Sequence, residues 1–162
     1  MRNTVICLAL FMLPSAGKGQ NDQPSNKHFW NTVKTTASPE QIWSIWIDVA
    51  NWKSWDTGLK DAEIEGAFEP KAKGHIISLE NRKSKFKVVA YTEGQSYTFK
   101  TNLPLGALYV RRYLTVEDDT TIFTHEVWFK GITAGLFAKQ FGPKFRALLP
   151  EVMENIKNIA EK

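Results

Sequence analysis

The chain has 162 residues, of which 43% are hydrophobic and 23% are charged. This composition is typical of a globular protein and excludes an intrinsically disordered one. The length suits one domain, large enough to bury a core without disulfides or a metal. The net charge of +4 comes from scattered cations, so a nucleic-acid surface is not expected.

The N-terminus has the pattern of a secretory signal peptide. Arg2 precedes an unbroken apolar run at 5–13, and small and turn-forming residues follow at 14–17. The run is shorter than the roughly 20 residues that a membrane-spanning helix needs. We predict a signal peptide at 1–19, with the cleavage position open within 16–20. A buried N-terminal strand or helix is the alternative.

Export would change the composition of the remaining chain. A polar linker at 20–27 and one domain at 28–162 would remain, in the periplasm or secreted. Cys7 is the only cysteine and lies in the predicted signal peptide, so the mature chain would offer no thiol. Loss of Arg2 and Lys18 would lower the net charge from +4 to +2.

The first predicted elements are a strand at 28–36 and two short helices. Ser38 can cap the first helix, Pro39 suits its first position, and Gln41 completes a capping box. Apolar residues then follow at helical spacing, with Trp43 and Trp46 as expected core residues. Asp48 can cap a second short helix that runs through Trp52.

The periodicity changes to two from about residue 62, which predicts strands. The expected strands lie at 61–66, 73–80, 85–92, 95–102, 107–117 and 121–130. Short turns rich in Gly, Pro, Asn and Asp separate them, as in an antiparallel meander.

After Gly131 the apolar residues recur with helical period up to Ile159. Pro143 and Pro150 lie inside this run. Proline removes a helical hydrogen bond and clashes with the preceding turn. We therefore predict a short helical segment at 134–141 and a main helix from Pro143 that bends near Pro150. The fold class is α+β, with a curved antiparallel sheet around a long C-terminal helix.

Two segments carry a family resemblance. Residues 37–43 read Ala-Ser-Pro-Glu-Gln-Ile-Trp, and residues 51–56 read Asn-Trp-Lys-Ser-Trp-Asp. Together they resemble the opening of the START-like (SRPBCC, Bet v 1-type) superfamily, in its polyketide cyclase/dehydrase-like branch. Weaker similarities follow in order at 64–66, 121–129, 149–151 and 155–157, so the resemblance covers about 28–161. It implies a helix-grip fold with a deep internal pocket, and it transfers no catalytic residue.

The last predicted hairpin has a register that can be derived from the sequence. If Val116 pairs with Thr121 across the loop at 117–120, then Arg112 faces His125, and every other pair on that face is apolar or nearly so. This face must therefore point inward. Its members are Leu108, Val110, Arg112, Leu114, Phe123, His125, Val127 and Phe129.

Arg112 and His125 are thus expected as a polar pair on a buried face. A buried Arg needs hydrogen-bond partners. On one hypothesis the pair anchors a ligand, with Arg112 binding a carboxylate or enolate and His125 acting as a donor or general base. On the other, both residues are structural, with Arg112 bonded to backbone carbonyls.

Further candidates lie on other elements. Tyr97 and Phe99 alternate with Lys100 and should face inward, and His75 would join them in one of two possible strand registers. Trp55 is expected near the cavity mouth, and Trp128 on the outer face, where exposure would mark a partner surface. The candidate ligand-binding residues are Arg112, His125, Tyr97, Phe99, Val110, Leu114, Phe123, Val127, His75 and Trp55.

Three functional hypotheses remain open. The first is an exported domain that binds a small hydrophobic molecule, either neutral or anionic, in its internal cavity. The second is a cyclase- or dehydratase-like enzyme with His125 and Arg112 as candidate catalytic residues. The third is a protein-interaction domain whose pocket is filled by its own aromatic side chains. No cofactor and no metal is expected, because the three histidines lack metal-ligand spacing. No integral membrane span is expected either, and oligomeric state is left open.

Overall fold

A computed structural model of the chain describes residues 24–162. The predicted signal peptide, Cys7 and the first part of the predicted linker lie outside these residues. The described part of the linker is joined to the first strand by a single antiparallel bridge between Ser25 and His28. Within residues 24–162, no helix has the length and hydropathy needed to cross a membrane.

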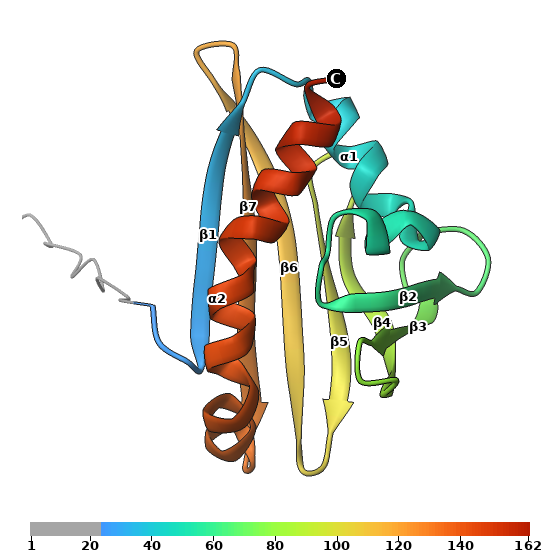
Figure 1. Cartoon of the computed structure of the whole chain (residues 1–162). Helices are drawn as coiled ribbons and strands as arrows, with labels where there is room; N and C mark the ends of the chain where they lie inside the picture. The colour runs from blue at the N-terminus through green and yellow to red at the C-terminus, as the bar shows by residue number, and fades with distance from the viewer. Residues whose placement is uncertain (1–23) are drawn as a thin grey trace, which may run out of the picture.

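Seven antiparallel strands form one curved sheet in the order β1-β7-β6-β5-β4-β3-β2 (Figure 1). The chain is a meander from β2 to β7, and β1 pairs with the last strand. The strands are β1 His28–Thr35, β2 Leu59–Ile64, β3 Lys73–Ser78, β4 Lys83–Thr92, β5 Ser96–Leu103, β6 Gly106–Glu117 and β7 Thr120–Gly131. The predicted strands are confirmed, with ends that differ by up to two residues.

The two short helices follow β1 as predicted: α1 Pro39–Ile47 and the 3-10 helix η1 Val49–Ser54. Ser38 accepts a hydrogen bond from the Gln41 backbone N–H, and the Gln41 side chain accepts one from the Ser38 N–H, which completes the capping box. Trp43 and Trp46 are buried as expected. Trp52 from η1 donates its indole N–H to the Trp46 carbonyl at 2.9 Å, which ties η1 to α1.

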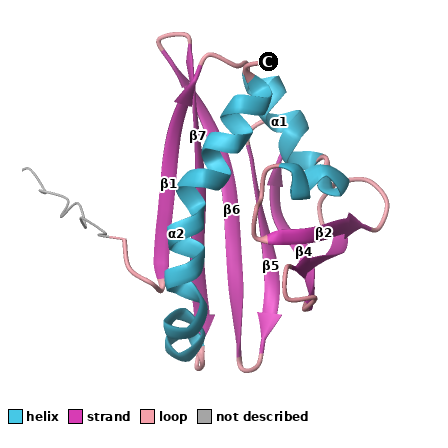
Figure 2. Cartoon of the chain, in the orientation of Figure 1, coloured by secondary structure: helices cyan, strands magenta, loops and turns pink. Residues whose placement is uncertain are grey.

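The C-terminal helix α2 runs unbroken over Ala134–Ala160 and lies on the same side of the sheet as α1 (Figure 2). The predicted break at Pro143 is therefore wrong. A proline deprives the carbonyl four residues earlier of its N–H partner. These carbonyls belong to Lys139 and Arg146, both exposed residues, so water can replace the lost hydrogen bonds and the helix continues.

The register of the β6–β7 hairpin is confirmed at every predicted pair, including Arg112 opposite His125. Asp118 and Asp119 form its turn with positive φ values of 46° and 59°. Two consecutive positive φ values define the tight turn that best matches the twist of a hairpin, and Asp tolerates them. Local turn chemistry therefore fixes which face of β6 and β7 meets the helix.

Candidate ligand-binding cavity

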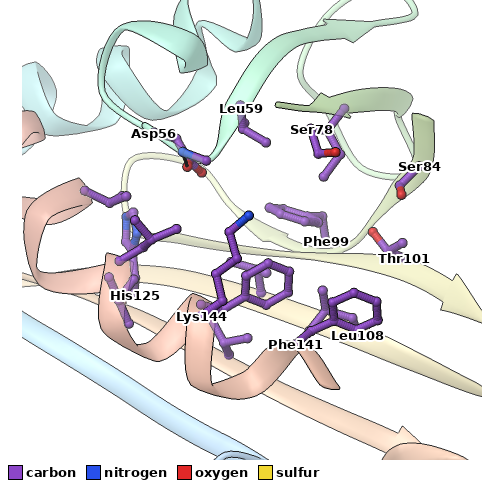
Figure 3. Close-up of a pocket in the computed structure, with 18 of the residues that line it drawn as sticks. Asp56, Leu59, Ser78, Ser84, Phe99, Thr101, Leu108, His125, Phe141 and Lys144 are labelled. Atoms are coloured by element: carbon purple, nitrogen blue, oxygen red, sulfur yellow. Dashed lines mark hydrogen bonds between the residues drawn. The ribbon is translucent and has the colours of Figure 1, made fainter. Parts of the chain in front are cut away.

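A cavity of about 290 Å³ lies between the inner face of the sheet and α2. Its walls come from η1 and the segment after it, from β2 to β7 and from α2, and most of the lining surface is apolar. Figure 3 shows Asp56 and His125 at one end of it, with Leu108 and Phe141 toward the other. The cavity is therefore a mostly hydrophobic chamber with a group of buried polar side chains at one end and further polar and charged side chains toward its rim.

Five of the predicted ligand-binding residues line this cavity: Phe99, Val110, Arg112, His125 and Val127. Leu108 and Phe129, which were predicted on the same inner face, line it as well. The inward orientation of Arg112 and His125 is thus confirmed, because both side chains reach one chamber from neighbouring strands.

Four predicted residues support the cavity from behind or pack elsewhere in the core. Tyr97 and Trp55 are each 1% exposed and contact the Arg112 guanidinium, and Phe123 is fully buried with its ring 6.5 Å from that of His125. Leu114 is partly buried and packs against the core. None of the four is among the lining residues.

The interior placement of His75 is wrong. Its neighbour Ile76 lines the cavity together with Ser78, so His75 points to the other face of β3. There its Nε2 lies 3.2 Å from a carboxylate oxygen of Glu63 on β2. A shift of one residue in a strand moves every side chain to the opposite face, and this was the alternative register.

Arg112 is 3% exposed and is held in an aromatic cage. The guanidinium carbon lies 4.5 Å from the ring centre of Trp52 and 4.7 Å from that of Trp55. One guanidinium nitrogen donates a hydrogen bond to the Tyr97 hydroxyl, which in turn donates to the Trp46 carbonyl at 3.2 Å. Ring faces attract a cation without neutralising it. The buried Nε has no partner among the described residues, so the cation retains unused hydrogen-bonding capacity.

His125 is 1% exposed and lies opposite Arg112. Burial holds the pKa of its imidazole well below the usual value of 6.5, and the neighbouring Arg112 cation lowers it further. His125 is therefore neutral at physiological pH. Its Nε2 has no hydrogen-bond partner in the part of the chain that is described, which leaves one ring nitrogen available as a donor or acceptor.

Asp56 is the residue that sequence reasoning did not select for the site. It follows η1 and lines the polar end of the cavity, where its Oδ1 accepts the backbone N–H of Gly58 at 3.0 Å. Burial raises the pKa of this carboxyl group above its usual value, and the charge of Arg112 opposes that rise. The sequence signal for Asp56 was weak: an acidic residue directly after Trp55, in a segment that was used above only for the family resemblance.

Charged residues mark the rim where the cavity meets solvent. Lys144 on α2 donates to Glu80, beside the β3–β4 turn, at 2.6 Å, and this hydrogen bond lowers the pKa of Glu80 to about 2. Arg82 lies over the ring of Phe141 at 5.4 Å. Both contacts join the helix to the hairpin through long side chains.

A curved antiparallel sheet that grips a C-terminal helix over an apolar chamber defines a class of protein, the START-like or Bet v 1-like domains. This chain belongs, more narrowly, to the family described as polyketide cyclase / dehydrase and lipid transport, whose model matches residues 28–161. Family and architecture together indicate a domain for hydrophobic ligands. No curated protein matches the chain in sequence.

Solved structures with the same fold are distant in sequence. A hypothetical protein from Helicobacter pylori has 10% identity and a TM-score of 0.67, with 98% of this chain and 99% of that chain covered. A START superfamily protein from Mycobacterium smegmatis has 16% identity and a TM-score of 0.59, over 83% and 97% of the two chains. Norcoclaurine synthase from Thalictrum flavum has 13% identity and a TM-score of 0.61, over 82% and 92%. At these identities the likeness shows the fold alone.

Proposed function

We propose that this chain is an exported START-like domain that binds a small hydrophobic molecule with one anionic or strongly polar group in its internal cavity. The observation that carries the proposal is Arg112, a buried cation at the end of an apolar chamber, whose Nε has no hydrogen-bond partner within residues 24–162. A buried charge left without full compensation is costly, so a ligand that supplies the missing acceptor gains binding energy there.

The walls supply the remaining affinity. Each Å² of apolar surface removed from water contributes about 25 cal/mol, so an aliphatic or aromatic ligand body gains several kcal/mol from a chamber of this kind. Arg112 and the neutral His125 then fix its orientation. Few convergent polar groups in an apolar pocket are the usual arrangement of small-molecule sites.

Native mass spectrometry of the protein purified from its own host tests this function. The expected result is a co-purified mass that is released on denaturation and contains an apolar body with an acidic or polar group. Preparations that are free of ligand, and that take up neither decanoate nor decanol when these are added, would overturn the proposal. The same spectra test export, because a mature chain should begin within residues 16–21 rather than at Met1.

A second candidate function is a cyclase- or dehydratase-like enzyme, favoured by the neutral His125 with its free Nε2 beside a cation. In that chemistry His125 would remove a proton and Arg112 would stabilise the resulting oxyanion. Replacing His125 with Gln separates the two functions. A binding protein should keep its affinity within a few-fold, whereas an enzyme should lose turnover by about 100-fold or more.

The hypothesis of a pocket filled by its own aromatic side chains loses its main support. The aromatic residues Trp52 and Phe99 line the chamber rather than fill it. Trp128 is half-buried on the outer face and stacks on Tyr109 at 5.2 Å, so it is not the isolated exposed aromatic that the interaction hypothesis required.

A further inference from the structure

Three aliphatic side chains stand exposed together at one end of the molecule. Leu105 in the β5–β6 turn is 72% exposed, Ile132 before α2 is 88% exposed, and Leu136 in the first turn of α2 is 65% exposed. Their loops are joined, since the Ile132 N–H donates to the Leu105 carbonyl at 3.0 Å and the Thr133 hydroxyl donates to the Pro104 carbonyl. Leu105, Ile132 and Leu136 are called the apolar tip below.

Leu105 is unusual for its backbone as well as its exposure. It has a positive φ of 54° in the two-residue turn between β5 and β6. That conformation favours Gly or Asn, and a branched aliphatic residue is strained in it. A leucine there is unfavourable twice, once for backbone strain and once for exposure to water. An outlier of this kind is a reason to look for a function at that position.

The surroundings of the apolar tip are basic. The sequence has no Asp or Glu at 94–116 or at 127–150, the two stretches that meet at this end. Lys130 and Lys139 are exposed beside the apolar tip, and Lys100 and Lys130 lie 5.9 and 5.8 Å from the ring centre of Tyr109. The β6–β7 turn, with Glu117, Asp118 and Asp119, lies at the opposite end of the long hairpin (Figure 1). Charge is therefore distributed unequally along the hairpin.

We infer that the apolar tip is a docking surface for an anionic lipid membrane, which Leu105, Ile132 and Leu136 enter while Lys130 and Lys139 contact the lipid headgroups. Proteins that bind a membrane surface place aliphatic residues in the acyl chains and aromatic and basic residues at the level of the headgroups. The apolar tip, the stacked Tyr109–Trp128 pair and the flanking lysines match this arrangement. Lysine stems cover apolar surface while their amines reach phosphate, and each cation near an anionic surface adds about 1 kcal/mol.

The apolar tip lies close to the apolar end of the cavity, which relates membrane docking to the ligand site. Leu103 and Leu108 flank the turn that carries Leu105, and both line the chamber. Leu108 lies toward the end away from Asp56 and His125 (Figure 3). A docked protein would therefore hold the apolar end of its cavity next to the bilayer. The docking does not depend on the proposed ligand and is tested without one.

The test is co-flotation of the full chain with vesicles of phosphatidylglycerol and phosphatidylcholine, compared with phosphatidylcholine alone. Binding should occur to the anionic vesicles and weaken with salt. The variant with Leu105→Asn, Ile132→Ser and Leu136→Ser should bind at least 10-fold more weakly. Val116→Ser is the matched control, because Val116 is 55% exposed beside the acidic turn, and it should bind as the native chain does.

Hydrogen–deuterium exchange gives a readout that is local to the apolar tip. Anionic vesicles should slow exchange of the backbone amides around 105–107 and 132–137, and leave those at 116–121 unchanged. Equal binding of the native chain and the triple variant, or no local protection, would overturn the proposal. Concentration-dependent dimerisation that the triple variant abolishes would also overturn it, in favour of a second copy as the occupant.

Leu105→Asn alone separates function from fold. It removes an exposed aliphatic group and relieves the strained φ, so we expect a higher midpoint of thermal unfolding together with weaker vesicle binding. A structural role for Leu105 predicts the reverse, a lower unfolding midpoint and unchanged binding, and that result would count against the proposal.

Discussion

Arg112 on β6 and His125 on β7 are paired residues of one antiparallel ladder, and both side chains enter the same chamber. Burial, and to a lesser extent the neighbouring cation, keeps the imidazole neutral, and the aromatic cage holds the cation in place. A carboxyl group, that of Asp56, joins them from the segment after η1. The polar end of the cavity thus contains one cation that acts on the pKa of both neighbours, lowering that of His125 and opposing the burial-driven rise at Asp56.

Replacing Arg112 with Met tests the anchor. The side chain keeps its approximate volume and loses its charge, so affinity for a carboxylate probe such as decanoate should fall by about 10- to 100-fold, as expected for hydrogen bonds to a charged group. Isothermal titration calorimetry measures it. Arg111→Met is the matched control, since Arg111 lies next in sequence but on the outer face with a side chain 48% exposed. Equal losses in both variants would argue against an anchoring role.

His125 should make stability fall as pH falls. Its pKa lies well below 6.5 in the folded chain, whereas the unfolded chain binds a proton near 6.5. Between these values the unfolded state holds more protons, so the free energy of unfolding decreases by up to about 1.4 kcal/mol per pH unit as the solution is acidified. Urea denaturation of the native chain and of His125→Gln at pH 7 and pH 5 measures it. A variant as sensitive to acid as the native chain would contradict this assignment.

Asp56 should have the opposite effect on the pH dependence of stability. Its pKa is raised in the folded chain above the usual 3.8, so the folded state holds the proton more tightly. Stability is then lost as pH rises from about 4 through the folded pKa, because a carboxylate must be buried. Asp56→Asn keeps an acceptor for the Gly58 N–H and removes that cost. The variant should be more stable than the native chain at pH 7, with the gain absent at pH 4. Its affinity for decanoate should also rise, since a competing negative charge beside Arg112 is gone.

Replacing two glycines of α2 with alanine should change the free energy of unfolding in opposite directions. A Cβ at Gly142 would lie 2.3 Å from the backbone oxygen of Asn26, so Gly142→Ala must push the segment before β1 away from the helix. We expect a loss of about 1–3 kcal/mol. A Cβ at Gly135 meets nothing within 4 Å, and Gly135→Ala should gain up to about 1 kcal/mol from helix propensity. Chemical denaturation of both variants gives the comparison. Similar effects at the two positions would show that the Asn26 segment adapts freely.

Signals that depend on near neighbours were sufficient to predict much of the fold. The period of two in β6 and β7, with an Asp118-Asp119 turn between them, determined the register and hence the inward pair of Arg112 and His125. The Ser38-Pro39 start determined α1 in the same way. These patterns are readable because backbone geometry and turn chemistry act over only a few residues.

Tertiary structure decided what depends on distant contacts. It carried α2 through Pro143, because the carbonyl that loses its partner belongs to an exposed residue, Lys139, where water can replace the bond. It turned His75 outward, because the pairing of β3 fixed one of two registers. It also brought Asp56 from the end of η1 to Arg112 on β6, more than fifty positions away. No local pattern encodes such a meeting, since it arises only when the sheet curves around the helix. The sequence by itself therefore determined an inner face with one polar pair, and the folded chain made that pair a caged cation with a carboxyl group and a neutral imidazole beside it.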